Sequence, residues 1–241
     1  MSATAVYIPP APKQERTAVR TEHLTKVYGR GEATVHALDR VTLAIFAGQF
    51  TAVMGQSGSG KSTLLHCIAG LDSPSSGKVW IGDTEITALA DKPLTLVRRE
   101  AVGFVFQSFN LLPTLDAKDN ILLPLKLAGK KPDQAWYDQV LDVLALRDRL
   151  THRPSELSGG QQQRVAVARA MITKPTVIFA DEPTCALDSA SGTALLTFLR
   201  HSVDQLGQTV VMVTHDAKAA SFADRTIRLA DGHVVADERR K

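Results

Sequence analysis

Apolar runs and alternating positions divide the chain into strand-rich and helix-rich stretches. Residues 18–27 and 35–45 have strand-like composition, and residues 50–54 form an apolar run typical of a buried strand. Residues 80–86 suit a hairpin with a tight Gly-Asp turn, and residues 102–106 form a further short apolar strand. The front of the chain is therefore predicted to be rich in antiparallel strands.

Helical periodicity takes over in the middle of the chain. Asp119 and Asn120 can cap a helix that runs to Leu127, and we expect this helix to kink or break at Pro124. A second helix fits residues 132–146, with apolar side chains on one face. These segments predict an inserted helical block.

Strong strand signals return in the last third. Residues 176–180 and 209–213 are almost wholly apolar, as expected for strands buried on both faces of a parallel sheet. Residues 190–206 between them show a helical pattern that stops at Gly207, so the order strand, helix, strand implies a right-handed crossover. Residues 226–235 predict a closing hairpin.

These patterns predict an α/β fold with a mostly parallel sheet, an N-terminal antiparallel β subdomain and an inserted α-helical subdomain. The length of 241 residues and 44% hydrophobic content support one large domain. We expect a disordered tail over 1–16, a domain over 17–236 and a charged tail over 237–241. Within the domain, the core and the antiparallel sheet take 17–107 and 172–236, and the helical subdomain takes 108–171.

Charge and cysteine content narrow the function classes. The 28 basic and 25 acidic residues are dispersed and give a net charge of +3, so composition makes no electrostatic case for a nucleic-acid partner. No apolar run reaches the roughly 18–20 residues that span a bilayer, and the N-terminus lacks a signal-peptide pattern, so we expect a cytoplasmic protein. Cys67 and Cys185 lack metal-type spacing, which suits thiols in a reducing compartment.

The sharpest local signal is a phosphate-binding loop that fits G-x-x-x-x-G-K-[ST] between a strand-like and a helix-like segment. Its residues are Gly55, Gln56, Ser57, Gly58, Ser59, Gly60, Lys61, Ser62 and Thr63. Glycines let the backbone turn N–H groups inward, and the following helix points its positive end at the same spot, so an anion is expected. Lys61 would reach nucleotide phosphates and Ser62 would ligate Mg²⁺. A Gly/Ser surface turn is the alternative.

Asp181 and Glu182 follow the apolar run at 176–180. In enzymes with a phosphate loop, an aspartate at a strand end completes the Mg²⁺ shell, and a glutamate beside it can act as general base. Without the loop, a solvated turn would explain the pair equally well. The presence of the loop favours a hydrolytic site.

A second glycine motif, Ser158-Gly159-Gly160-Gln161, opens another predicted helix. A capping box between Ser158 and Gln161 explains the motif locally. However, two adjacent glycines also leave the backbone N–H groups at a helix N-terminus uncovered by side chains. A γ-phosphate could therefore approach them closely. Because one nucleotide cannot lie at both helix starts in one subunit, the motif predicts a second copy of the chain.

With these motifs in this order, residues 18–236 resemble the nucleotide-binding subunits of ATP-binding cassette (ABC) transporters. In that family the phosphate loop and the 157–161 motif face each other across a head-to-tail dimer that holds two ATP molecules. The resemblance implies a P-loop NTPase core, ATP and Mg²⁺ as cofactors, and ATP hydrolysis. It assigns Tyr28 to adenine stacking, Gln107 to sensing Mg²⁺ and the γ-phosphate, Asp181 to the metal, Glu182 to base catalysis, Asp188 to the loop crossing the dimer, and His215 to the γ-phosphate.

Within the family, residues 54–60, 71–74 and 106–113 look like the macrolide-export and lipoprotein-release branch. The branch implies an FtsX-like four-span membrane permease with a large extracytoplasmic domain as partner, and a place on the cytoplasmic face of the cell membrane. An alternative is an ATP-dependent regulator of a membrane partner that controls a cell-wall enzyme without transport. A soluble cassette acting on nucleic acid or ribosomes is disfavoured by the lack of a basic patch.

Two features leave alternatives open. Cys185 stands where the family usually has Gly or Ser, and it is either a tolerated small residue or an oxidation-sensitive thiol. Phe109, Leu111 and Leu112 lie where the family docks its membrane partner, but they could equally belong to the helical core. Structural roles are expected for the remaining histidines, His23, His36, His66, His152, His201 and His233.

Overall fold

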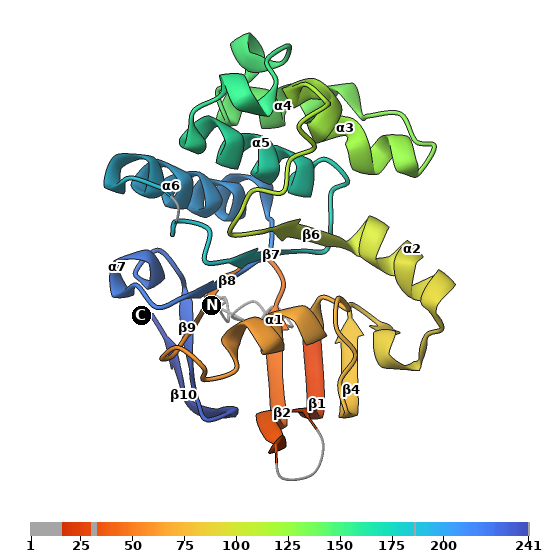
Figure 1. Cartoon of the computed structure of the whole chain (residues 1–241), viewed down its shortest axis with the longest axis vertical. Helices are drawn as coiled ribbons and strands as arrows, with labels where there is room; N and C mark the ends of the chain where they lie inside the picture. Colours follow the sequence, from red (N-terminus) through yellow and green to blue (C-terminus); the bar gives the residue numbers. More distant parts are fainter. Residues whose placement is uncertain (1–15, 30–32, 186, 241) are drawn as a thin grey trace, which may run out of the picture.

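The computed structural model describes residues 16–29, 33–185 and 187–240. The tail expected over 1–16, apart from Arg16, lies outside these residues. Within the described ranges, no helix is both long and apolar enough to cross a lipid bilayer. The described chain forms two sheets and a helical block (Figure 1).

An antiparallel sheet forms near the N-terminus, as the strand patterns predicted. Its strands, in the order β2-β1-β4-β5, are β2 (Val35–Phe46), β1 (Thr17–Tyr28), β4 (Ser76–Ile81) and β5 (Thr84–Glu85). Trp80 on β4 pairs with Glu85 on β5, which confirms the hairpin predicted at 80–86.

The central sheet has the order β10-β9-β3-β8-β7-β6. Its strands are β10 (His233–Arg239), β9 (Arg225–Ala230), β3 (Phe50–Met54), β8 (Val210–Thr214), β7 (Val177–Asp181) and β6 (Val102–Val105). The strands from β9 to β6 pair in parallel, and β10 alone is antiparallel. The mostly parallel sheet is thus confirmed.

Strand β10 is longer than the sequence pattern predicted and takes in residues 237–239, which were expected in a charged tail. The guanidinium of Arg225 donates two hydrogen bonds to the Asp237 carboxylate, both at 2.6 Å, across the β9–β10 pair. This ion pair stabilises the polar end of the strand, which a hydrophobic pattern does not reveal.

The helices divide between the faces of the central sheet. They are α1 (Lys61–Ile68), α2 (Asp91–Ala101), α3 (Ala117–Leu127), α4 (Gln134–Val143), α5 (Gly159–Met171), α6 (Ser189–Leu206) and α7 (Ala217–Ala220), with short 3₁₀ helices η2 (Ile86–Ala88), η3 (Arg147–Arg149) and η4 (Pro154–Glu156). In Figure 1, α3, α4 and α5 gather at one end of the molecule, and α1 lies beside the antiparallel sheet. The inserted helical block is therefore present.

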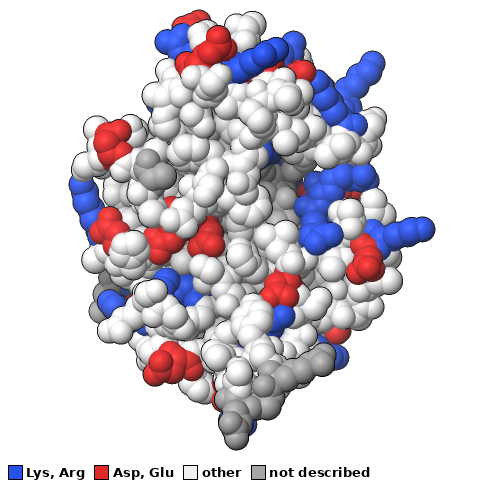
Figure 2. Space-filling model, viewed as in Figure 1, with Lys and Arg blue, Asp and Glu red and all other residues white. Residues whose placement is uncertain are grey.

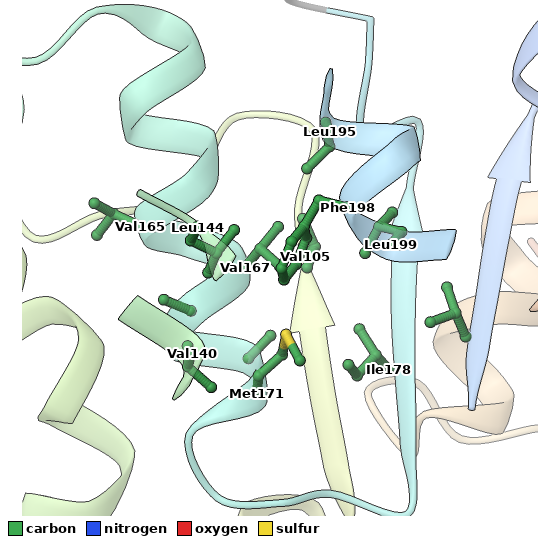
Figure 3. Packing of buried hydrophobic residues seen from close by; sticks show 14 of the residues in the cluster. Val105, Val140, Leu144, Val165, Val167, Met171, Ile178, Leu195, Phe198 and Leu199 are labelled. Atoms are coloured by element: carbon green, nitrogen blue, oxygen red, sulfur yellow. The ribbon is translucent and has the colours of Figure 1, made fainter. Parts of the chain in front are cut away.

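The central sheet separates two hydrophobic cores, because successive strand residues point to opposite faces. On β7, Ile178 and Ala180 join the core that contains α3 to α6, whereas Val177 and Phe179 join the core that contains α1 and the antiparallel sheet. Figure 3 shows the first core, with side chains that include Val140, Leu144, Val165, Met171, Ile178 and Leu195.

Helix α3 differs from its prediction in two respects. Its N-cap is Asp116, whose carboxylate accepts a hydrogen bond from the Asp119 N–H at 2.7 Å, so the predicted caps Asp119 and Asn120 were wrong. The helix also continues through Pro124 to its end. Its buried residues, such as Ile121, pack into the first core, and this packing outweighs the hydrogen bond that proline removes.

Candidate functional site

The phosphate loop connects β3 to α1, and two of its glycines touch backbone from both sheets. A Cβ on Gly60 would lie 2.2 Å from the Ala37 carbonyl oxygen of β2, and one on Gly55 would lie 2.3 Å from the Leu229 oxygen of β9. Gly60 also has a φ of 98° as the N-cap of α1. Only glycine fits both contacts and this dihedral.

Backbone hydrogen bonds tie the same loop to the β9–β10 turn. The Gly232 N–H donates to the Ser59 carbonyl at 3.2 Å, and the Gly232 carbonyl accepts from the Asp39 N–H of β2 at 3.0 Å. The loop is therefore held between the antiparallel sheet and the central sheet.

A cavity of about 540 Å³ lies against this loop. It is lined by Val35, Ala37, Ser57, Gly58, Gly60, Lys61, Ser62, Thr63, Glu182 and His215. Lys61 is a buried residue, and its ammonium donates to the Gln56 carbonyl at 2.7 Å. A larger cavity of about 710 Å³ beside Trp80 contains none of the predicted site residues, so the chemistry belongs to the smaller one.

Two of the three residues predicted to bind Mg²⁺, Ser62 and Asp181, lie together, whereas Gln107 contacts neither of them through a hydrogen bond. The Ser62 hydroxyl donates to Asp181 Oδ1 at 3.0 Å, and Asp181 is the last residue of β7. Hydroxyl and carboxylate oxygens suit Mg²⁺, which usually takes only one or two protein ligands and fills its shell with water and nucleotide phosphates. In the part of the chain that the structure describes, no group of three or more His, Cys, Asp or Glu could hold a metal by itself. The pair therefore fits a nucleotide-bound Mg²⁺.

His66 is a neighbour of this pair that the sequence did not single out. Its Nε2 lies 3.7 Å from Asp181 Oδ2. Residues four apart share a helix face, so the spacing from Ser62 to His66 was the available signal.

Glu182 and His215 form a close pair at the cavity. His215 Nδ1 lies 2.9 and 3.0 Å from the two Glu182 carboxylate oxygens, and the hydrogen bond with Glu182 raises the pKa of His215. Glu182 has a φ of 46°, a left-handed conformation that costs roughly 1–2 kcal/mol in a residue with a side chain. Its N–H donates to the Val213 carbonyl at 3.0 Å and its carbonyl accepts from the Cys185 N–H at 3.1 Å, and these bonds hold the strained backbone.

Gln107, two residues after the end of β6, contacts the turn that follows Glu182 but is absent from the lining of the cavity. Its Nε2 donates to Cys185 Sγ at 3.0 Å. The thiol that departs from the family pattern is thus in direct contact with a predicted site residue. After Gln107, the carbonyls of Phe109 and Asn110 accept hydrogen bonds from Arg169 of α5 at 2.8 and 2.6 Å, which fixes this segment to the helical block.

The second glycine motif has the predicted capping box. Gln161 N–H donates to the Ser158 hydroxyl at 3.3 Å, and Ser158 N–H donates to Gln161 Oε1 at 2.8 Å. Asp188 caps α6 and accepts from the Ser191 hydroxyl at 2.6 Å. A Cβ on Gly160 would lie 3.0 Å from the same hydroxyl, so the starts of α5 and α6 are neighbours.

The start of α1, at the phosphate loop, and the start of α5, at the Ser158 motif, are not brought together within the chain. Buried residues of α1 belong to one core and those of α5 to the other, so the two helices lie on opposite faces of the central sheet (Figure 1). Ser158, Gly159, Gly160, Gln161 and Asp188 are absent from the lining of the phosphate-loop cavity. Tyr28, at the end of β1, is half exposed, and its hydroxyl donates to Asp72, a residue that the sequence did not single out.

Comparison with known proteins gives concordant matches. The ABC transporter family model matches residues 38–185. The macrolide export ATP-binding/permease protein MacB of Marinobacter nauticus is 44% identical over 224 residues, which are 92% of this chain and 35% of that protein. The uncharacterized ABC transporter ATP-binding protein MJ0796 of Methanocaldococcus jannaschii is 44% identical over 227 residues, 92% of this chain and 97% of that protein.

A solved dimeric structure of the MJ0796 cassette, in a post-hydrolysis state with ADP and Pi, superposes with a TM-score of 0.83 and 43% identity. The match covers 92% of this chain and 99% of that one, which confirms the predicted fold class. The chain thus spans about a third of the macrolide-export relative and nearly all of the MJ0796 cassette. Because the family model covers more than half of the chain, and the relatives align over nine-tenths of it, the chain belongs to the ABC transporter family, as one of its ATP-hydrolysing cassettes.

Proposed function

We propose that this chain is the nucleotide-binding subunit of a transporter or mechanotransmission complex, and that two copies close head to tail on two ATP molecules. In this proposal the dimer drives an FtsX-like four-span permease from the cytoplasmic face of the cell membrane. Two relatives support the proposal, since one is named a macrolide export ATP-binding/permease protein and the other is a dimer with ADP and Pi.

The observation that carries the proposal is the placement of the two glycine motifs. The phosphate loop opens α1 on one face of the central sheet, and the Ser158 motif opens α5 on the other. Each is an N-terminus with bare backbone N–H groups, which favours an anion. Since one chain cannot bring both to one triphosphate, a second copy must supply the Ser158 motif.

We assign the roles at the cavity from its geometry and from the family resemblance. Loop N–H groups and Lys61 bind the phosphates, and Ser62 and Asp181 hold Mg²⁺, which neutralises charge on the β- and γ-phosphates. Glu182 accepts the proton of the attacking water. His215, whose Nδ1 lies 2.9 Å from the Glu182 carboxylate, contacts the γ-phosphate.

Three further residues complete the assignment. Gln107 senses Mg²⁺ and the γ-phosphate, Tyr28 stacks on adenine, and Asp188 lies in the loop that crosses the dimer.

The first test separates catalysis from binding. Glu182→Gln keeps the shape of the side chain but cannot accept the proton, so we expect ATP turnover to fall about 10²- to 10⁴-fold while an ATP-bound dimer accumulates. Lys61→Ala is the matched control and should stay monomeric with ATP, because the phosphates lose their cation. Size-exclusion chromatography and phosphate release measure both, and full turnover by the Glu182 variant would contradict the role.

A second test addresses the partner copy. A bulky residue at Ser158, as in Ser158→Phe, should block closure and ATP hydrolysis without preventing nucleotide binding. Ser158→Thr retains the capping hydroxyl and is the control. Equal hydrolysis by both variants would argue against the head-to-tail dimer.

We place the membrane partner on the segment 109–112 and on a groove of about 530 Å³ between α2, β6, α3 and α5. The two are joined by Arg169, which lines the groove and donates hydrogen bonds to the Phe109 and Asn110 carbonyls. The lining of the groove combines apolar side chains, such as Phe104 and Leu127, with Arg98 and Arg99. Figure 2 shows Lys and Arg side chains gathered over the edge that carries α2 in Figure 1. This chemistry suits a short amphipathic segment with acidic residues.

The two leucines that were left open between docking and core differ in their exposure to solvent. Leu111 packs against the first core, whereas Leu112 is 44% exposed. We therefore expect Leu112→Glu to weaken co-purification with a permease while ATP binding persists, and Leu111→Glu to destabilise the fold. Loss of folding in the Leu112 variant would contradict a docking role.

The alternative proposal is an ATP-dependent regulator of a membrane partner that controls a cell-wall enzyme without transport. The cavity would perform the same chemistry. Reconstitution with the partner separates the two, since ATP-driven movement of a substrate across the vesicle membrane occurs only in a transporter.

A further inference from the structure

Tyr28 belongs to a three-residue cluster with Lys26 and Asp72. Lys26 and Tyr28 are two apart on β1, so their side chains leave the strand on the same face. The Tyr28 hydroxyl donates to Asp72 Oδ2 at 2.7 Å, and the Lys26 ammonium donates to Asp72 Oδ1 at 2.7 Å. Lys26 also donates to the Ser73 carbonyl at 2.6 Å, so the cation is held from two sides.

The cluster restrains both the tip and one face of the Tyr28 ring. The hydroxyl is fixed by Asp72, and the Lys26 ammonium lies over the ring, 4.8 Å from its centroid, in a cation–π contact. The Lys26 side chain is only 11% exposed, whereas Tyr28 remains 43% exposed. The exposed part of the ring is therefore presented in one orientation.

Asp72 is itself anchored to the helix that the phosphate loop opens. Its N–H donates to the His66 carbonyl in the last turn of α1 at 3.2 Å. The same rigid helix thus carries the phosphate loop at its start and the anchor of the Tyr28 ring just beyond its end. This arrangement sets the distance between a base on Tyr28 and phosphates on the loop.

Electrostatics support a stable cluster. Burial alone would raise the pKa of Asp72, but the hydrogen bonds from Lys26 and Tyr28 hold it below its ordinary value. Burial and the hydrogen bond to Asp72 raise the pKa of Tyr28, so its hydroxyl keeps its proton and remains a donor. Asp72 is therefore an anion, and Lys26 and Tyr28 are its donors, at neutral pH.

We propose that Asp72 and Lys26 are positioning residues that fix the Tyr28 ring for stacking on the adenine base. This inference rests on the proposed stacking role of Tyr28. A ring that is already ordered loses less conformational freedom on binding, an advantage that corresponds to about two- to tenfold in Kd for one side chain.

The test compares ATP with inorganic tripolyphosphate, which has phosphates but no base, by calorimetric titration in the presence of Mg²⁺. We expect Asp72→Ala to raise the Kd for ATP about two- to tenfold and to leave the Kd for tripolyphosphate unchanged. Tyr28→Phe keeps the ring and removes only the hydroxyl, so it should weaken ATP binding in the same sense. Glu100→Ala removes a comparable 2.7 Å pair with Lys130 and should change neither Kd.

A double-mutant cycle distinguishes this inference from the function on which it rests. In a Tyr28→Ala background, Asp72→Ala should have no further effect on ATP binding, because no ring remains to be positioned. An unchanged Kd for ATP in the single Asp72 variant, or equal weakening of tripolyphosphate binding, would overturn the positioning role. Unchanged ATP binding in Tyr28→Ala itself would instead overturn adenine stacking. If Asp72→Ala does not fold, Tyr28→Phe still decides the outcome.

Discussion

The phosphate loop offers a direct comparison between backbone strain and steric clash. Gly58 and Gly60 both have positive φ angles, of 81° and 98°. A Cβ on Gly58 would meet nothing within 4 Å, whereas one on Gly60 would lie 2.2 Å from the Ala37 carbonyl oxygen. Alanine at either position therefore carries the same kind of dihedral cost, but only Gly60→Ala also forces backbone apart.

The magnitudes follow from these geometries. A left-handed dihedral costs roughly 1–2 kcal/mol in alanine. Alanine also lowers the conformational entropy of the unfolded chain, which stabilises the folded protein by about 0.4–1 kcal/mol. We therefore expect Gly58→Ala to lower the free energy of unfolding by about 1 kcal/mol. Overpacking adds about 1–3 kcal/mol, so Gly60→Ala should lower it by about 2–4 kcal/mol.

Urea denaturation without nucleotide measures both values, because a Cβ on either glycine could otherwise touch the phosphates. Circular dichroism at several urea concentrations gives the free energy of unfolding for each variant. Equal losses of stability in the two variants would show that the close approach of Gly60 to β2 adds no cost. They would refute the conclusion that this contact requires glycine.

Three other predictions concern the site and its surroundings. Because Glu182 raises the pKa of His215, Glu182→Gln should lower that pKa toward the ordinary value of 6.5, and a histidine NMR titration that shows no decrease would contradict the pair. Burial raises the pKa of Cys67 to about 12, whereas Cys185 is exposed, so a maleimide should label only Cys185 in the native protein and both cysteines after denaturation. Asp116→Ala removes the N-cap of α3 and should cost about 1 kcal/mol in urea unfolding, and an unchanged midpoint would show that the cap contributes nothing.

Periodicity predicted the elements whose burial follows a simple rule. The strands at 50–54 and 176–180 are apolar because both faces of the sheet are covered, and the structure places them in its centre as β3 and β7. The loop at 55–63 was predicted because few sequences satisfy its backbone geometry. Such signals depend only on neighbouring residues.

The features that the sequence did not predict depend on contacts between residues far apart in the chain. Helix α2 was not predicted; none of its residues is fully buried, and it packs through a partly buried face against Gly70 and β6. The N-cap of α3 is Asp116 and not Asp119 or Asn120 because all three residues are of types that favour an N-cap, so the local pattern does not choose among them. The contact of Tyr28 with Asp72 joins residues 44 positions apart, so no local pattern contains it.

The attachment of the phosphate loop to carbonyls of β2 and β9 has a consequence for protein engineering. A shortened cassette that keeps only the central sheet and its helices would lack the β2 backbone that Gly60 packs against. Redesigns that aim for a minimal nucleotide binder must therefore retain β2, or rebuild a backbone surface in its place. The antiparallel sheet is in this sense part of the nucleotide pocket rather than an accessory module.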